Sequence, residues 1–339
     1  MILTPRQKVL NIANLNGNGC GFWTGHPHPE AEALYMKAAK VTDIEGVYTF
    51  LNDDCRWISA CASYKHPEGR HMFDTALGHE RRKTLSGGGY FADCEDVSEV
   101  DKFPWPDVKY LDFKNKLEEI ESFKDKAVFS GFWSHFFHLA ADFFGMENYF
   151  VKMHTAPEVV ESVTNRIVDF YVEANDMFLK AAGDAFDIFF FGNDFGTQLD
   201  LLISPDSFKK FVLPGFKRII SVAKKHGKKV MLHSCGSIYR VIPDLIDAGV
   251  DILHPLQALA ANMGPEKLAK EFGKHLAFCG GVDTQDLLVN AKPLQIKEAV
   301  YRLKDIFGPN FIVSPSHEAL LSNVPFGNVI AMAEAAHEK

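Results

Sequence analysis

The segment KKVMLHSCG (228–236) places a histidine and a cysteine two positions apart at the end of a short apolar run. Alternate side chains of an extended chain point to the same side, so we expect His233 and Cys235 to face the same way. An imidazole nitrogen and a thiolate are ligands that zinc favours. The pair therefore predicts half of a metal site. A structural cysteine beside a hydrogen-bonded histidine explains the spacing equally well.

A catalytic zinc needs about three protein ligands and one open position, so a third ligand must come from elsewhere in the chain. Two residues qualify because each follows another apolar run. Cys279 lies in HLAFCGG (275–281), and His317 ends the stretch FIVSPSH (311–317). The residues alone leave the choice between them open.

Asp194 follows the apolar run DIFFFG (187–192), within the stretch GNDFGTQ. Its carboxylate is predicted to face the same site, either as a catalytic contact to the substrate or as the partner of a metal-bound histidine. An Asx turn or a helix N-cap is the alternative, because aspartate after a strand commonly has that structural role.

Residues at the ends of other apolar runs are candidates for substrate binding. The stretch GFWTGHPHPE (21–30) carries two histidines in a loop that Pro27 and Pro29 stiffen. The candidate substrate contacts are Phe22, Trp23, His26, Asp54, Gln198, Gln257 and Asp283. The alternatives are core packing for the two aromatic residues and a solvated turn with an internal ion pair around Asp54.

These candidate residues can lie close together only if the strands before them end at a common place. Five apolar runs in the second half of the chain, at 187–192, 228–234, 250–255, 275–281 and 311–315, are each followed by a helical pattern. Runs at 19–25, 56–60 and 127–133 are plausible further strands. Continuous apolar strands that alternate with helices predict a parallel sheet covered on both faces.

Eight such strands predict a (β/α)8 TIM barrel with an N-terminal helical extension and an insertion after strand two, at about 61–108. An open doubly wound sheet is the alternative. The barrel is favoured because polar residues follow nearly every run, and the strand ends of a barrel meet at one mouth. We expect the whole chain, 1–339, to form one such domain.

Composition narrows the class of protein. The net charge of −8 argues against nucleic-acid binding. No run of 18 apolar residues occurs, and the N-terminal pattern is that of a helix rather than of a signal peptide, so we expect no membrane span. Six scattered cysteines do not form a disulfide framework and indicate a reducing, cytoplasmic setting.

Several of these segments together resemble the uroporphyrinogen decarboxylase superfamily. They are LTPRQKVLNIANLNG, GNDFGTQLDLLISPDSFKKFVLPGFKRII, HSCGSIYRVIPDLIDAGVDILHPLQ, FCGGVDTQDLL and SPSHEALLSNVPFGNVIAM. The resemblance implies a (β/α)8 barrel with its site at the mouth. The decarboxylases of this superfamily carry an arginine-rich N-terminal motif, whereas the matching stretch here, GFWTGHPHPE, has no arginine.

The sequence is closer to the cobalamin-dependent methyltransferase branch. HSCG matches the H-x-C pair of that branch, and SPSHEAL places His317 where thiol-directed members carry a cysteine. The resemblance implies zinc held by His233, Cys235 and His317, with Cys279 as the alternative third ligand. It also implies a corrinoid (cobalamin) as co-substrate and a corrinoid protein as partner.

A methyl group would then pass between the corrinoid and a small substrate, a thiol or a methoxy-arene. The histidine in place of a thiolate and an apolar pocket wall lean towards the methoxy-arene. A metal-free decarboxylase and a non-catalytic corrinoid- or tetrapyrrole-binding protein are the alternatives. Barrels of this kind often pair, so we include a homodimer among the expectations.

Overall fold

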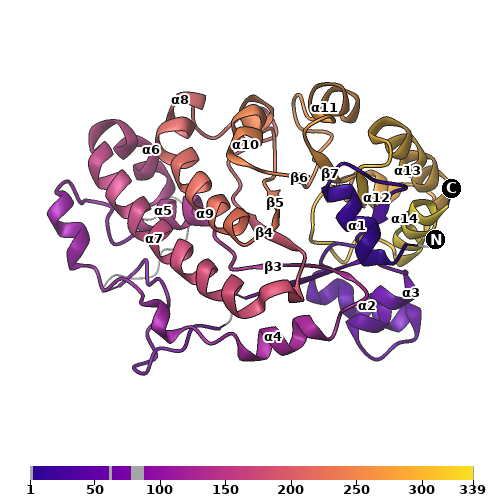
Figure 1. The fold of residues 1–339 in the computed structure, drawn as a ribbon. Coiled ribbons are helices and arrows are strands. Elements are labelled where there is room, and N and C mark those ends of the chain that lie inside the picture. Colours follow the sequence, from indigo (N-terminus) through magenta and orange to yellow (C-terminus); the bar gives the residue numbers. More distant parts are fainter. Residues whose placement is uncertain (1–2, 61–62, 78–87, 339) are drawn as a thin grey trace.

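Eight parallel strands form a single sheet in this computed structural model, which describes residues 3–60, 63–77 and 88–338. Their order is β1-β8-β7-β6-β5-β4-β3-β2. The bounds are β1 Gly21–Phe22, β2 Cys55–Ser59, β3 Ala127–Gly131, β4 Ile188–Gly192, β5 Lys229–His233, β6 Ile252–His254, β7 Ala277–Val282 and β8 Phe311–Pro315. Figure 1 shows these strands inside a surrounding layer of helices. The arrangement is a nearly closed (β/α)8 TIM barrel, as the sequence predicts.

Helices connect the strands along the outside of the barrel. Their bounds are α1 Pro5–Ala13, α2 Pro29–Ala39, α3 Ile44–Phe50, α4 Lys114–Glu121, α5 Phe136–Phe144, α6 Met146–Thr155, α7 Pro157–Ala182, α8 Pro205–Ser207, α9 Leu213–Lys225, α10 Ile242–Ala248, α11 Pro265–Phe272, α12 Leu287–Asn290, α13 Pro293–Phe307 and α14 Phe326–His337. No helix in the described ranges is long and apolar enough to cross a membrane.

The strands read as continuous apolar runs because both of their faces are buried. In β4, Phe190 belongs to the cluster inside the barrel, whereas Phe189 and Phe191 belong to the cluster between the strands and the helices. The same alternation separates Trp23, which points inwards, from Phe22, which packs outwards. Burial on both faces is what a parallel barrel requires.

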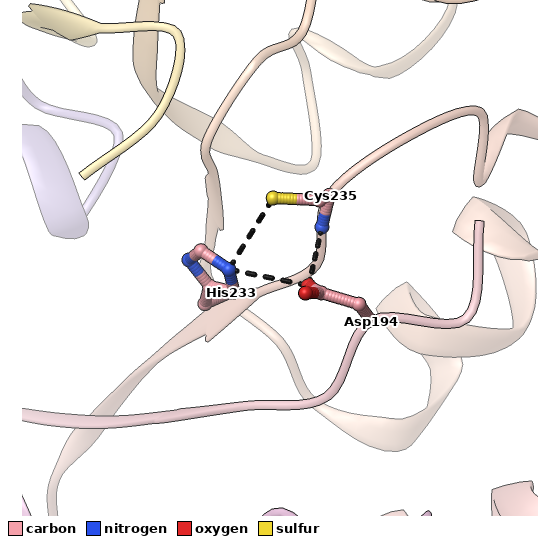
Figure 2. A group of neighbouring side chains, drawn as sticks. All are labelled: Asp194, His233 and Cys235. Atoms are coloured by element: carbon pink, nitrogen blue, oxygen red, sulfur yellow. Dashed lines mark hydrogen bonds and ion pairs between the residues drawn. The ribbon is translucent and has the colours of Figure 1, made fainter. Parts of the chain in front are cut away.

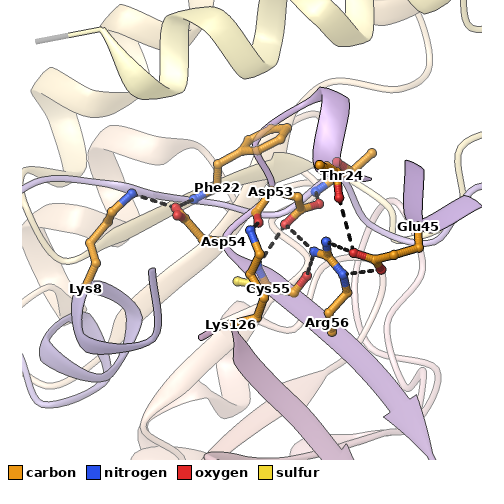
Figure 3. Close-up of polar contacts among 10 residues, drawn as sticks. Lys8, Phe22, Thr24, Glu45, Asp53, Asp54, Cys55, Arg56 and Lys126 are labelled. Atoms are coloured by element: carbon orange, nitrogen blue, oxygen red, sulfur yellow. Dashed lines mark hydrogen bonds and ion pairs between the residues drawn. The ribbon is translucent and has the colours of Figure 1, made fainter. Parts of the chain in front are cut away.

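The junction between β1 and β2 is closed by two buried carboxylates. The backbone N–H of Asp54 donates to the carbonyl of Phe22, and the Asp54 side chain accepts from the Phe22 N–H at 2.9 Å. The Asp53 side chain accepts from the Thr24 N–H at 2.7 Å, and Lys8 of α1 pairs with Asp54 at 2.8 Å (Figure 3). Side-chain oxygens thus accept the backbone N–H groups that backbone carbonyls would accept in a regular pair of strands.

Helix α1 covers the N-terminal end of the barrel. Its Thr4 cap and Gln7 form a capping box, which fixes the start of the helix. Val9, Ile12 and Ala13 belong to the same buried cluster as residues at the beginnings of β2, β3 and β4. Because this end is filled, the accessible mouth is at the opposite end, where the strands finish.

The long connection between β2 and β3 holds the predicted insertion. Of the predicted range 61–108, residues 61–62 and 78–87 lie outside the described part of the chain. Within the rest, a 3-10 helix spans Val97–Lys102, and another, Val108–Tyr110, begins at the last residue of the range. Phe91, Phe103 and Trp105 pack with Phe143 of α5, so this segment has an aromatic contact of its own with the barrel helices.

The helical segment after β4 is interrupted. Ser204 caps α8 through a hydrogen bond from the Ser207 N–H, but residues Phe208–Val212 form a π-helical turn before α9. Pro214 explains the interruption, because proline has no N–H to donate to the preceding turn.

Candidate metal centre at the barrel mouth

The ends of β4, β5 and β6 lie side by side, and the residues at and after the ends of β4 and β5 bring Asp194, His233 and Cys235 together. Gly192 pairs in register with His233, and His233 pairs with His254. Beyond the strand ends, the Cys235 sulfur lies 3.6 Å from Nε2 of His233, and Oδ1 of Asp194 lies 3.2 Å from the same nitrogen (Figure 2). Asp194 also accepts the Cys235 N–H at 2.8 Å, which fixes the backbone beside the thiol.

Two glycines make this convergence sterically possible. A Cβ at Gly192 would lie 2.7 Å from Cβ of His233 and 2.7 Å from the Trp133 ring. Gly236, directly after the cysteine, has φ +81° and lies against the backbone of Gly196. A side chain at Gly192 would collide with the candidate ligand His233. A side chain at Gly236 would collide with the backbone of Gly196, and it would also have to adopt a left-handed backbone conformation.

A second group of possible ligands shares Cys235. One ligand atom each from Cys235, His317 and Glu318 lie within 4.8 Å of one another, as do those of Asp194, His233 and Cys235. The Ala319 N–H donates to Nδ1 of His317 at 3.1 Å, which leaves Nε2 of that ring for a metal. The Cys235 thiol therefore belongs to both groups of possible ligands.

The charges of these groups are strongly coupled. Burial acts to raise the pKa of Asp194, but the hydrogen bond and charge of His233 and the Cys235 N–H hold that pKa well below its usual range. Burial acts to lower the pKa of His233, yet Asp194, Cys235 and Glu318 raise it well above the ordinary value. In His317, interaction with Cys235 raises the pKa against the effect of burial. The carboxylate of Asp194 and the ring of His233 thus stabilise each other's charged forms.

The donor set fits zinc. It offers imidazole nitrogen, thiolate sulfur and carboxylate oxygen, which are the three ligand types that zinc takes. One carboxylate oxygen, Oε2 of Glu318, is buried without a hydrogen-bond partner, which is costly unless a cation is close. The residues that could hold an ion form two groups that share Cys235, one with Asp194 and His233 and the other with His317 and Glu318.

His254 contacts the candidate ligand His233 and was not among the predicted residues. Its Nδ1 lies 3.2 Å from Nδ1 of His233, and its ring packs against Trp23 and Phe190. Burial, together with the positive charges of His233 and His317, holds its pKa well below the ordinary value. A signal existed in the sequence, because His254 also ends an apolar run, VDILHP.

Glu318 and His138 were also not predicted. His138 of α5 lies close enough to Asp194 and His233 to interact with their charges. Glu318 follows His317 directly, and its Oε2 lies 3.4 Å from Nδ1 of His233. A glutamate beside a candidate ligand carries no distinct sequence pattern, so its position emerges only from the fold.

Cys279, the alternative third ligand, lies elsewhere. It is fully buried inside the barrel, and neither group of possible ligands includes it. Its thiol interacts with Ser314 and with the charge of Asp53, at the β1–β2 junction. The structure therefore brings His317, and not Cys279, to the thiol of Cys235.

The predicted substrate contacts divide into two sets. Gln257 and Gln198 lie at the mouth and are joined at 3.0 Å, and Gln257 also accepts the Gly236 N–H at 2.9 Å. His26 is exposed and packs edge-on against the half-buried Trp57, whose ring lies near Trp133.

The other predicted contacts have structural partners. Trp23 lies beneath His254 inside the barrel, and Phe22 points outwards to His337. Asp54 lies at the β1–β2 junction with Lys8. Asp283 accepts three backbone N–H groups at the start of α12. The structure does not bring these four to the candidate metal ligands.

Two cavities open near these residues. One of about 350 Å³ adjoins the candidate metal ligands, and it is lined by Gln257, Thr284, Gln285, His317, Ala319, Leu321, Asn323 and Val324. A second, of about 290 Å³, lies beside β1 and β2 between His26, Trp57 and Arg56. Arg56 is already ion-paired in this cavity, because its guanidinium donates to both oxygens of Glu45 at 2.6 and 2.7 Å.

Comparison with known proteins places the fold. Residues 90–339 match the family model of Uroporphyrinogen decarboxylase (URO-D). A solved structure of a methyltransferase from Methanosarcina mazei is similar over 99% of this chain and 98% of that chain, with a TM-score of 0.64 and 16% sequence identity. That likeness shows a common fold. No curated protein matches the sequence. The match over most of its length shows that this chain belongs to the uroporphyrinogen decarboxylase family.

Proposed function

We propose that this protein is a zinc-dependent methyltransferase that moves a methyl group between a corrinoid and a small substrate. The observation that carries the proposal is the position of the Cys235 thiol. It lies between two groups of metal-binding side chains at the barrel mouth, and one of those groups borders a cavity of about 350 Å³ through His317. A metal beside a cavity of this size is accessible to a small molecule.

Zinc at this place would act as a Lewis acid, either by favouring the thiolate form of a bound thiol or by polarising an ether oxygen. The chain's own residues supply the positioning. Asp194 holds the backbone N–H of Cys235, and Gln257 holds that of Gly236, so the loop after β5 is fixed from both sides. The half-buried Trp57 packs against Trp133, which contacts the His233 ring, and this apolar surface suits an aromatic substrate.

Exposed leucines on the mouth loops support a corrinoid protein as partner. Leu199, Leu259 and Leu321 follow β4, β6 and β8, and their exposed fractions are 81%, 62% and 54%. Exposed apolar side chains around an opening favour contact with another apolar surface. A corrinoid that approaches the mouth would meet these leucines first.

A metal-free decarboxylase is the second candidate, and the family match favours it. The charges at the mouth speak against a polyanionic substrate, because acidic side chains lie among the candidate ligands and Arg56 is paired with Glu45. A substrate with many carboxylates needs free guanidinium groups. A non-catalytic corrinoid- or tetrapyrrole-binding protein is the third candidate.

Elemental analysis followed by two transfer assays separates these candidates. The methyltransferase proposal predicts about one zinc per chain, and methyl transfer from methylcobalamin to a thiol or from a methoxy-arene to reduced cobalamin. Purified protein without metal that decarboxylates a porphyrinogen would establish the second candidate. Corrinoid binding without transfer in either direction would establish the third.

The cellular setting and the oligomeric state stay predictions. We propose the cytoplasm, where the cysteines would remain reduced. The five cysteines in the described ranges, Cys20, Cys55, Cys94, Cys235 and Cys279, are free thiols. A homodimer is the expected assembly, and sedimentation velocity tests it.

A further inference from the structure

We propose that the substrate is a small uncharged molecule with an apolar body and one neutral polar group, and that Gln285 and Asn323 select it. This inference rests on the proposed methyltransferase function, and it narrows the thiol or methoxy-arene to uncharged members of either class. The observation that carries it is the wall of the cavity of about 350 Å³ beside His317.

The wall of this cavity offers hydrogen-bonding groups without charge. Besides His317, it consists of three amide side chains, one hydroxyl and three aliphatic side chains. No lysine, arginine, aspartate or glutamate lines it in the part of the chain that the structure describes. His317 adds no charge as a metal ligand, because a histidine binds metal in its neutral form. Amides and hydroxyls pair with a neutral polar group, whereas a carboxylate or sulfonate requires a cation beside it.

Two carboxylates close to the cavity oppose an anion further. An oxygen of Glu318 lies 3.7 Å from Nδ1 of the lining residue His317. Glu30 accepts a hydrogen bond from Ser322, the residue before Asn323, at 3.3 Å. Neither carboxylate is paired with a lysine or an arginine in the described ranges. A negatively charged substrate would therefore meet like charge, which reduces its affinity relative to a neutral one.

The amide of Gln285 stands on a fixed turn after β7. Asp283 accepts the N–H of Gln285 at 3.2 Å and those of the next two residues at 2.8 and 2.9 Å. The Thr284 N–H donates to the Ser316 hydroxyl at 3.1 Å, which joins this turn to the end of β8. The side-chain amide of Gln285 has no hydrogen-bond partner among the described residues, so it is available to a ligand.

The amide of Asn323 stands on the loop after β8, which is also held in place. The Val324 N–H donates to the carbonyl of Leu321 at 3.1 Å and closes a turn around Asn323. The hydroxyl of the buried Tyr35 donates to the carbonyl of Val324 at 3.0 Å. Within the described ranges the Asn323 amide likewise has no hydrogen-bond partner. Two amides on two fixed loops thus border one cavity, and few well-placed polar groups are what gives a pocket its specificity.

The remainder of the wall sets the body of the ligand. Ala319, Leu321 and Val324 are aliphatic, and an apolar surface that covers them gains affinity from burial. The volume of about 350 Å³ lies at the lower end of the range for ligand pockets. The cavity therefore suits a single aromatic ring or a short alkyl chain.

Pairs of ligands of equal shape and different charge test the proposal in the full-length protein. The arene pair is 4-methoxybenzamide and 4-methoxybenzoate, and the thiol pair is mercaptoacetamide and mercaptoacetate. Isothermal titration calorimetry on the protein as purified measures binding, and methyl transfer to or from cobalamin is assayed separately. The variants are Gln285→Lys and Asn323→Lys. Asn165→Lys, at an exposed position of α7, is the control for added charge.

An uncharged substrate predicts a preference that lysine reverses. The wild type binds the amide of each pair at least about 10-fold more tightly than the carboxylate. Each lysine at the cavity shifts this ratio towards the carboxylate by at least about 10-fold, because a cation now lies beside the bound anion. Asn165→Lys leaves the ratio unchanged. One of the two cavity variants is sufficient if the other does not fold.

Three results overturn the inference: carboxylates bound as tightly as amides by the wild type, shifts in both cavity variants no larger than in Asn165→Lys, or no binding of either member. The proposed function fails differently. In that case the preference for amides persists in calorimetry, but no methyl group passes between any of these compounds and cobalamin.

Discussion

The imidazole of His254 lies directly against the imidazole of His233, with their Nδ1 atoms 3.2 Å apart and both rings buried. Only one hydrogen can lie between two such nitrogens. If it belongs to His233, then Nε2 of His233 has a free lone pair towards Cys235. With the hydrogen on His233, His254 would orient that ring for a metal, which is the positioning role that partners of metal-bound histidines commonly have.

Replacing His254 by phenylalanine should separate metal binding from stability. We expect the His254→Phe variant to lose about 10-fold in zinc affinity, because His233 is no longer oriented. The metal-free variant should be as stable as the wild type or more stable, since the buried Nε2 of His254 has no hydrogen-bond partner to lose. Chelator competition and thermal unfolding measure the two quantities. A loss of stability in the metal-free variant that accompanies the loss of zinc affinity would mean that His254 is only a packing residue.

Cys235 and Cys279 form a matched pair for the choice of ligand. Cys235→Ser should lower zinc affinity by at least about 100-fold, more than the loss of a residue that only supports a ligand. Cys279→Ser should keep the metal, because its thiol lies inside the barrel away from both ligand groups. Zinc content after dialysis gives the answer, and metal loss in Cys279→Ser alone would reverse our assignment.

Gly192 should tolerate no side chain. Gly192→Ala places a methyl group 2.7 Å from Cβ of His233 and from the Trp133 ring, and overpacking of this kind costs about 1–3 kcal/mol. Gly327→Ala in α14 is the control, because a Cβ there meets nothing within 4 Å and should stabilise the helix by about 0.5–1 kcal/mol. Urea unfolding of the two variants is expected to give shifts of opposite sign. The glycine of β4 would have no steric role if both variants were equally stable.

Asp53 should make stability depend on pH. Burial raises its pKa from 3.8 to about 6, against the lowering effects of Arg56 and of hydrogen bonds from Thr24 and Cys55. Between these two values the folded chain keeps a proton that the unfolded chain releases. Stability from this group is therefore present in full at low pH and falls as pH rises towards about 6, by about 3 kcal/mol in all.

Comparison with Asp53→Asn isolates that contribution. In metal-free protein, the unfolding free energy of the wild type minus that of Asp53→Asn should increase by about 2.4 kcal/mol when the pH is lowered from 7 to 4. Urea unfolding across this range provides the measurement. Parallel curves for the two proteins, or a difference that shrinks at low pH, would show that burial does not raise the pKa of this carboxyl.

The amino-acid sequence by itself determines the architecture and which strand ends meet at the barrel mouth. Apolar runs that end in polar residues predict eight parallel strands and a common mouth, and all eight strands form within or beside the predicted ranges. Parallel strands carry their ends to one side, so His233, Cys235, Asp194 and His317 could be expected together before their distances were known. Local patterns are sufficient here because strand ends, unlike side-chain directions, follow from hydrophobic runs and turns alone.

The tertiary structure decides which way each side chain faces and what lies beside it. Phe22 and Trp23 are neighbours in sequence, yet one packs outwards and the other inwards, because successive residues of a strand point to opposite faces. The Asp54 side chain accepts the Phe22 N–H at the β1–β2 junction, where the two ends of the strand order meet.

His254 meets His233 because β5 and β6 pair in one register, and Glu318 reaches the ligands because the loop after β1 clamps its backbone. These contacts join segments far apart in the chain. They depend on register and loop packing, which no local run of residues encodes.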